Sequence, residues 1–360
     1  MLNNIVNLSK KLIAVPSTKE NHKALHEVLK VCERELGVLQ SKKFEKNSVP
    51  SLLFYNTPKI PQRFKVILNA HLDVVPAKNN QYKPILKGNK LYGRGSNDMK
   101  AAASVMILLF KEIAKKVNYP LGLQLVTDEE VGGFSGTKYQ IAKGIKADFV
   151  IAGEPTDFGV NNKAKGIVWA KVKAKGKSAH GAYPWLGENA ILKINDFINL
   201  LKEKYPVPKK EVWRTTINLA KVSTENSTYN KVPDDCEAWL DIRYIPEESV
   251  TIIKDVEKLL LKGLKLEVLL KEPPQLTNEK NLFVKKLRES TNKVTGKISP
   301  VIVKHGASDI RHYNQSGTDG VTFGPIGEGQ HTDNEWVSIK SLWDYYRILK
   351  DYLLSLNNKI

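Results

Sequence analysis

Cysteine is scarce in this chain, since Cys32 and Cys236 are the two cysteines among 360 residues. Two cysteines cannot build a disulfide framework, and no CxxC pair offers thiolate ligands to a metal. We therefore expect reduced thiols and a cytoplasmic protein. Long apolar runs are lacking too: no window of about 18 uninterrupted apolar residues occurs, which argues against a membrane span. The N-terminal 17 residues (MLNNIVNLSKKLIAVPS) predict an amphipathic helix and not an export signal.

Arginine and acidic residues are few beside lysine. Of 56 basic residues only eight are arginine, and 38 acidic residues leave a net charge of +18. Such a charge can indicate a nucleic-acid partner. However, the lysines are spread along the whole chain, and no arginine–aromatic cluster accompanies them. We therefore expect no nucleic-acid partner; a compositional bias towards lysine explains the charge, and a preference for anionic substrates is the alternative.

The chain is long enough for two domains, and its 41% hydrophobic and 26% charged residues are typical of a globular protein. Helical and strand-like runs alternate over the first 155 residues, which predicts an α/β layer fold. The runs are strands at 52–55, 64–69, 121–126 and 149–152, and a helix at 101–116.

From about Gly166 the pattern changes. Strands predicted at 167–174, 215–222, 236–244 and 264–270, with helices at 190–204 and 248–263, suit a small α+β domain with an antiparallel sheet. A helix at 278–295 and strands at 299–303 and 320–323 then return to the first pattern. We therefore predict a discontinuous domain of residues 1–165 and 276–360, interrupted by an inserted domain of residues 166–275.

Histidine and acidic side chains follow predicted strands in several segments. In open α/β sheets, ligands gather beyond the carboxyl ends of the strands, so these segments should converge in space. The segments are Asn69–Pro76 (NAHLDVVP), Gly93–Lys100 (GRGSNDMK), Val126–Gly133 (VTDEEVGG), Ala152–Thr156 (AGEPT) and Gly327–Glu335 (GEGQHTDNE).

Five of these side chains would make a metal-binding set of two histidines and three carboxylates: His71, Asp98, Glu130, Glu154 and His331. Mixed nitrogen and oxygen ligands suit a Lewis-acidic divalent ion, zinc by default, with cobalt or manganese as possible substitutes. Five residues serve two ions only if one carboxylate bridges them.

Two further acids stand beside these ligands. Residues two apart on an extended chain face the same side, so Asp73 can accept the second ring N–H of His71. The neighbours Glu129 and Glu130 diverge, so one can bind metal while the other takes a proton. Each piece also has a plainer interpretation, as a structural histidine, a solvated acidic loop or a glycine turn. The chain has no GxSxG, HExxH, P-loop or GxGxxG motif.

In their order and separations, HLDVVP, GRGSNDMK, DEEVGG, GEPT and the closing HTDNEWV resemble the M20 family of zinc peptidases and deacylases. That family includes succinyl-diaminopimelate desuccinylase, acetylornithine deacetylase, glutamate carboxypeptidase and dipeptidases. The resemblance spans roughly residues 5–355 and implies a zinc-exopeptidase-like catalytic domain. It also implies an inserted ferredoxin-like domain that serves as lid and dimer interface.

The resemblance implies a role for each matching residue of the catalytic domain. Asp98 would bridge the two ions, with a cis peptide between Asp98 and Met99. His71 and Glu154 would complete one site, and Glu130 and His331 the other. Glu129 would be the general base, and Asp73 the partner of His71.

The inserted domain matches the family in the segment Lys177–Pro184 (KSAHGAYP). There His180 would reach into the partner subunit's active site of a homodimer and stabilise the oxyanion. Asn230 and Arg243 would contact the substrate, the arginine pairing with a carboxylate; an ordinary surface salt bridge of Arg243 is the alternative. Ser308, in the segment ASDIR, would line the pocket.

These observations together predict a two-zinc amidohydrolase that releases a free amino acid. The first substrate hypothesis is an N-acyl amino acid, as for a desuccinylase or deacetylase. A carboxypeptidase or dipeptidase acting on a short peptide is the alternative. A catalytically silent binding protein on the same scaffold is a hypothesis of another class, which the retention of all five ligands and the base argues against.

Overall fold

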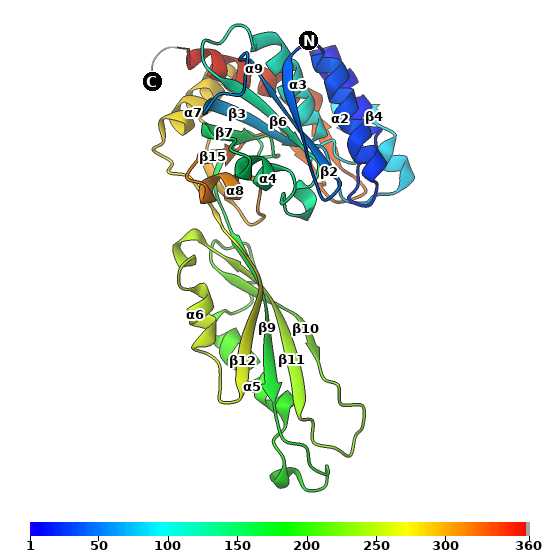
Figure 1. Ribbon diagram of the computed structural model, residues 1–360, viewed down its shortest axis with the longest axis vertical. Helices are drawn as coiled ribbons and strands as arrows, with labels where there is room; N and C mark the ends of the chain where they lie inside the picture. Colours follow the sequence, from blue (N-terminus) through cyan, green and yellow to red (C-terminus); the bar gives the residue numbers. More distant parts are fainter. Residues whose placement is uncertain (358–360) are drawn as a thin grey trace. The chain divides into compact units, whose positions relative to one another are not determined.

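The structure is a computed structural model that describes residues 1–357, and its contacts divide the chain into two compact units (Figure 1). The first unit comprises Met1–Asn162, Leu276–Ile302 and the chain from Ser308 onward, and the second comprises Lys163–Gln275 with Val303–Ala307. The insertion predicted over 166–275 begins three residues earlier, at Lys163. The short segment 303–307, predicted in the first domain, instead packs with the second unit.

The first unit is built on a mixed sheet whose strands follow the order β1-β2-β6-β3-β7-β15-β8-β13, with β14 beside β8. The inner strands β6, β3, β7 and β15 run parallel to one another. The strands are β1 (Gln40–Lys46), β2 (Val49–Tyr55), β3 (Phe64–His71), β6 (Leu121–Val126), β7 (Ala147–Ala152), β8 (Val160–Ala164), β13 (Gln275–Leu276), β14 (Val301–Lys304) and β15 (Asp319–Thr322).

Helices cover both faces of this sheet, because alternate residues of its strands are apolar on both sides. Leu52, Phe54 and Val66 join a core with α1, α2, α3, α7 and α9, whereas Leu53 and Ile67 join another with α4 and α8. The helices are α1 (Leu2–Ile13), α2 (His22–Leu36), α3 (Lys100–Ile113), α4 (Thr137–Ala142), α7 (Leu282–Thr295), α8 (Ile310–Gln315) and α9 (Ile339–Ser355).

A smaller antiparallel sheet lies in the same unit, in the order β16-β17-β5-β4. It joins two loops that are far apart in sequence, because Trp336 of β17 pairs with Tyr92 of β5. Its strands are β4 (Ile85–Lys87), β5 (Lys90–Tyr92), β16 (Gly327–Glu328) and β17 (Trp336–Ser338).

The second unit is an antiparallel sheet of order β10-β11-β9-β12 with α5 and α6 on one face. Residues of β11 alternate between buried and half-buried, and the buried ones, such as Leu240 and Ile242, pack against the two helices. The elements are β9 (Gly166–Lys175), α5 (Ala190–Lys204), β10 (Thr216–Ser223), β11 (Asp235–Tyr244), α6 (Ile252–Glu257) and β12 (Leu264–Glu272).

The predicted α/β class is confirmed, and most predicted elements lie within a few residues of the observed ones. The helix predicted over 248–263 is wrong in length, because α6 spans only Ile252–Glu257. The chain leaves the helix where Leu259 and Leu260 pack against the core of the second unit. Within residues 1–357, no helix combines the length and apolar character needed to cross a membrane.

Candidate metal centre

Three of the predicted ligands stand at the carboxyl ends of neighbouring parallel strands. His71 is the last residue of β3 and lies opposite Val126, the last residue of β6. Glu130 follows β6 within a single 3-10 turn, Glu129–Val131, and Glu154 comes two residues after the end of β7. Because these strands are parallel neighbours, their carboxyl ends bring the three side chains to one edge of the sheet.

The other two predicted ligands come from loops at the small sheet. Asp98 lies between β5 and α3, and its peptide bond to Met99 is cis, as the sequence analysis expects. His331 lies between β16 and β17 with a positive φ of 62°. Pairing of β5 with β17 brings these two loops side by side.

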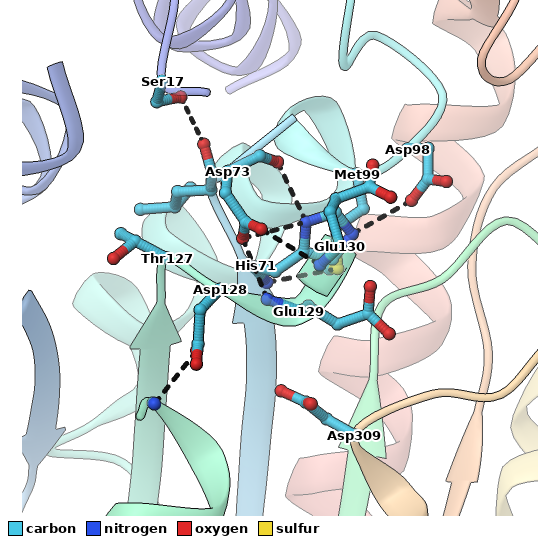
Figure 2. A network of polar contacts seen from close by, with 12 residues as sticks. Ser17, His71, Asp73, Asp98, Met99, Thr127, Asp128, Glu129, Glu130 and Asp309 are labelled. Carbon is cyan, nitrogen blue, oxygen red and sulfur yellow. Dashed lines mark hydrogen bonds and ion pairs between the residues drawn. The ribbon is translucent and has the colours of Figure 1, made fainter. Parts of the chain in front are cut away.

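Together the five side chains form two groups that share Asp98. His71, Asp98 and Glu154 make one group, and Asp98, Glu130 and His331 the other; within each group the ligand atoms lie within 4.8 Å of one another. Oδ1 of Asp98 is 3.0 Å from Nε2 of His71, which is also 3.5 Å from Oε1 of Glu154. Oδ2 of Asp98 is 3.4 Å from Nε2 of His331, which is 3.1 Å from Oε2 of Glu130. The two oxygens of one carboxylate therefore face different groups. Figure 2 shows the contact between Asp98 and His71.

The electrostatics of both groups favour positive charge. Burial alone would lower the pKa of His71, but the carboxylates of Glu154, Asp73 and Asp98 raise it well above its usual value. Hydrogen bonds to Asp98 and Glu130 raise the pKa of His331 to about 10. Carboxylates that hold protons on two imidazoles can exchange those protons for divalent cations. The donor set of two imidazoles and three carboxylates thus fits two hard or borderline metal ions.

Asp73 connects the ends of β3 and β6, which carry the candidate ligands His71 and Glu130. Its carboxylate accepts the backbone N–H of Glu129 at 3.2 Å and of Glu130 at 3.0 Å. Nδ1 of His71 lies 3.1 Å from the carbonyl oxygen of Asp73 and 3.6 Å from its Oδ1. The acceptor closest to the ring is therefore the backbone oxygen, whereas the sequence analysis expects the carboxylate there. The carboxylate instead fixes the turn that carries Glu129 and Glu130.

Glu129 is half-buried among other acids. Burial first, and then the negative charges of Glu154 and Asp309, raise its pKa well above the usual value. Burial also raises the pKa of Asp128 to about 7, with a further contribution from Asp309. A carboxyl group with a raised pKa can accept a proton and later return it at neutral pH.

The loop beyond this turn is held from α8, through contacts that the sequence analysis does not foresee. Thr137 donates its hydroxyl to Oδ2 of Asp309 at 2.5 Å. Arg311 and Nε2 of His312 both donate to the carbonyl oxygen of Gly132, at 2.7 and 2.8 Å. Burial lowers the pKa of His312 to about 3, so its ring is neutral.

The predicted oxyanion and substrate-binding residues are divided between the two units. Ser308 is buried in the first unit, two residues before α8, whereas His180, Asn230 and Arg243 belong to the second. His180 is exposed, and its Nδ1 accepts the backbone N–H of Ala182 at 3.1 Å. Asn230 is exposed as well.

Arg243 has a partner within its own strand. It donates to both carboxylate oxygens of Asp241, at 2.9 and 3.2 Å. This is the salt bridge that the sequence analysis keeps as the alternative to substrate binding.

The profile of peptidase family M20/M25/M40 matches residues 67–355. The chain belongs to this family. The resemblance seen in the motifs is therefore confirmed, and the M20 assignment makes the protein a metal-dependent hydrolase of amide bonds.

The similarity of this M20 protein to known relatives extends over nearly its whole length. It is 27% identical to a succinyl-diaminopimelate desuccinylase of Pelagibacter ubique, over 97% of this chain and 99% of that protein. It superposes on a tripeptidase from Staphylococcus aureus with a TM-score of 0.82 and 23% identity, covering 100% and 99% of the two chains. A dinuclear metal-binding peptidase of the M20 family from Bacillus subtilis gives a TM-score of 0.74 at 13% identity, covering 100% and 99%. These structures establish the fold.

Proposed function

We propose that this M20 protein hydrolyses the amide bond of an N-acyl amino acid, as a desuccinylase or deacetylase does, and releases the free amino acid. The similarity to a desuccinylase over 97% of the chain supports this substrate class. The single observation that carries the chemistry is the shared Asp98, whose two oxygens face separate groups of candidate ligands.

We assign two zinc ions to these groups, with cobalt or manganese as substitutes. His71 and Glu154 would complete one site and Glu130 and His331 the other, with Asp98 common to both. Two nitrogen and three carboxylate donors support zinc over calcium or magnesium, which prefer oxygen ligands alone. When bound, the ions supply Lewis acidity at the scissile carbonyl and lower the pKa of water.

Glu129 is the general base of the proposal. Its raised pKa suits a group that takes a proton from the attacking water and then returns it to the leaving amine. Asp73 holds the Glu129 N–H and thereby fixes the turn from which the carboxylate projects.

We propose that the second unit, which contains the predicted insertion 166–275, serves as the lid and as the interface of a homodimer. Nδ1 of His180 accepts a hydrogen bond, which leaves Nε2 as the ring nitrogen that can donate to an oxyanion in a partner subunit. The exposed apolar side chains Tyr183, Trp185, Leu186 and Leu192 follow His180 and support an interface there.

Three residues are assigned to substrate binding. The planar guanidinium of Arg243 already makes two parallel hydrogen bonds to Asp241, and a substrate carboxylate can replace that partner. Asn230 and Ser308 would add neutral donors.

The test is metal analysis joined to a substrate panel. The purified protein should hold two divalent ions per chain, and a chelator should abolish hydrolysis that added zinc or cobalt restores. N-succinyl and N-acetyl amino acids should be turned over faster than dipeptides and tripeptides. Faster hydrolysis of the peptides would favour the carboxypeptidase or dipeptidase alternative, and metal binding without turnover of any amide would favour a silent binding protein.

A further inference from the structure

In the part of the chain that the structure describes, the donors to the buried carboxylate of Glu335 all come from one loop, the loop that ends at Asp98. Glu335 is 1% exposed. Its Oε1 accepts the backbone N–H of Asn97 at 2.9 Å and of Asp98 at 3.0 Å. Its Oε2 accepts the backbone N–H of Gly95 at 3.0 Å and Nη1 of Arg94 at 2.6 Å. Three backbone groups and a guanidinium thus converge on one anion, an arrangement like the backbone nests that bind free anions.

Further hydrogen bonds fasten the same two segments. The carbonyl oxygen of Glu335 accepts the N–H of Gly93 at 3.2 Å. The carbonyl oxygen of Thr332 accepts Nη2 of Arg94 at 3.3 Å and Nε2 of Gln81 at 2.9 Å. His331 directly precedes Thr332. These hydrogen bonds therefore join the loop of Asp98 to the loop of His331.

Glu335 is not among the candidate ligands, although its side chain is a carboxylate close to them. Within residues 1–357, the four hydrogen bonds to its carboxylate come from Arg94, Gly95 and the backbone of Asn97 and Asp98, and none comes from a ligand atom of the two groups. A charge this deeply buried is stable only when its donors are in place. The four donors of the loop depend on the carboxylate in turn, because without it they would lose their acceptor.

We infer that Glu335 is a positioning residue that fixes Asp98 against His331 and thereby sets the geometry of both metal sites. The inference rests on the proposed function, in which Asp98 is common to the two ions. Because Asp98 belongs to both groups, a displaced Asp98 weakens both. Loss of Glu130 or Glu154, by contrast, removes a ligand from one group alone.

The experiment measures Zn²⁺ affinity and needs no substrate. Metal-free protein is titrated with Zn²⁺ in competition with a chromophoric chelator, which yields a dissociation constant for each site. In Glu335→Gln the amide oxygen can still accept from two of the four donors, but the amide NH₂ group faces the other two. We expect both constants to rise by about 10- to 100-fold, as for other residues that support metal ligands. Asp333→Asn is the matched control: Asp333 lies in the same segment, is exposed and pairs with Lys78, so both constants should stay as in the wild type.

Two further variants separate positioning from simpler roles. If Glu335 served only to neutralise Arg94, the double variant Arg94→Gln/Glu335→Gln would regain wild-type affinity, and the inference would be overturned. Glu335→Asp keeps the charge but withdraws the carboxylate by one methylene. It should fold, as checked by circular dichroism, and still bind Zn²⁺ more weakly at both sites, so the inference remains open to test even if the glutamine variant does not fold.

The outcomes also distinguish this inference from the proposed function. Wild-type protein that binds no Zn²⁺ overturns both. Wild-type protein that binds two ions, with both Glu335 variants unchanged or weakened at one site only, overturns the role of Glu335 and leaves the two-metal proposal standing.

Discussion

Replacing Gly133 by alanine tests whether the turn that carries Glu129 and Glu130 is held from α8. Gly133 has a φ of +67°, and a Cβ there would lie 2.0 Å from Oδ1 of Asp309. Ordinary contacts between heavy atoms are about 3.5 Å, so Asp309 or the turn has to move by more than about 1 Å. Either movement disturbs the loop that begins with the proposed base.

The cost has two parts that a control variant can separate. A left-handed backbone costs an alanine about 1–2 kcal/mol. The collision with Asp309 adds about 1–3 kcal/mol, as for other overpacked sites. Gly296 has nearly the same φ, +70°, and a Cβ there would meet nothing within 4 Å. Gly296→Ala should therefore lose only the first part.

Thermal unfolding and amide hydrolysis measure the two consequences. We expect the midpoint of Gly133→Ala to fall below that of Gly296→Ala by about 2–4 °C for each kcal/mol of difference. Turnover should fall by up to about 10²-fold in Gly133→Ala, because a displacement of about 1 Å at a catalytic group has that effect. Turnover of Gly296→Ala should stay at the wild-type level. Equal midpoints and equal turnover in the two variants would refute the reasoning.

Three further predictions concern single groups. Glu129→Gln should keep both metals and lose about 10²–10⁴-fold in turnover. Glu130→Gln should instead lose metal from one site. Equal metal loss in the two variants would contradict the roles of Glu129 as base and Glu130 as ligand. Mixing inactive His180→Ala chains with inactive Glu129→Gln chains should restore activity through mixed dimers, and no recovery despite proven subunit exchange would exclude a shared site. His312, with its pKa lowered from 6.5 to about 3, takes up a proton only in the unfolded chain between those values. The free energy of unfolding should therefore fall from pH 6.5 towards pH 3, by about 1.4 kcal/mol per pH unit at most. Denaturant titrations should show a shallower fall in His312→Gln, and identical slopes would disprove the assignment.

Strand ends and the candidate ligands beside them could be predicted from the sequence because each has a local signature. The alternating and apolar runs around Phe64–Asn69 and Leu121–Val126 mark strands, and polar motifs follow each one directly. Parallel neighbours then bring His71 and Glu130 to one edge without any knowledge of packing. The α/β class follows from the same alternation.

Contacts between distant segments could not be predicted. Glu335 stands in a recognisable motif, but nothing local says that its partners lie at Gly95–Asp98. Likewise, the carboxylate of Asp73 is two residues from His71 and still bonds to the turn after another strand. The helix expected over 248–263 ends early for a related reason, since packing of Leu259 and Leu260 overrides helical periodicity. These contacts between distant segments depend on which buried groups compete for the same partner, and no local pattern in the sequence records that competition.

The sharing of Asp98 between two groups has a consequence for how the protein is made. Synthesis supplies His71, Asp98 and Glu154 early, and with them every member of one group, while the other waits for His331 near the end of the chain. Glu335, which would hold the Asp98 loop, emerges from the ribosome later still. A nascent chain can therefore carry the proposed base, Glu129, well before it can assemble two metal sites. In the proposal amide hydrolysis needs both, so the enzyme would remain inactive at least until His331 and Glu335 have been synthesised.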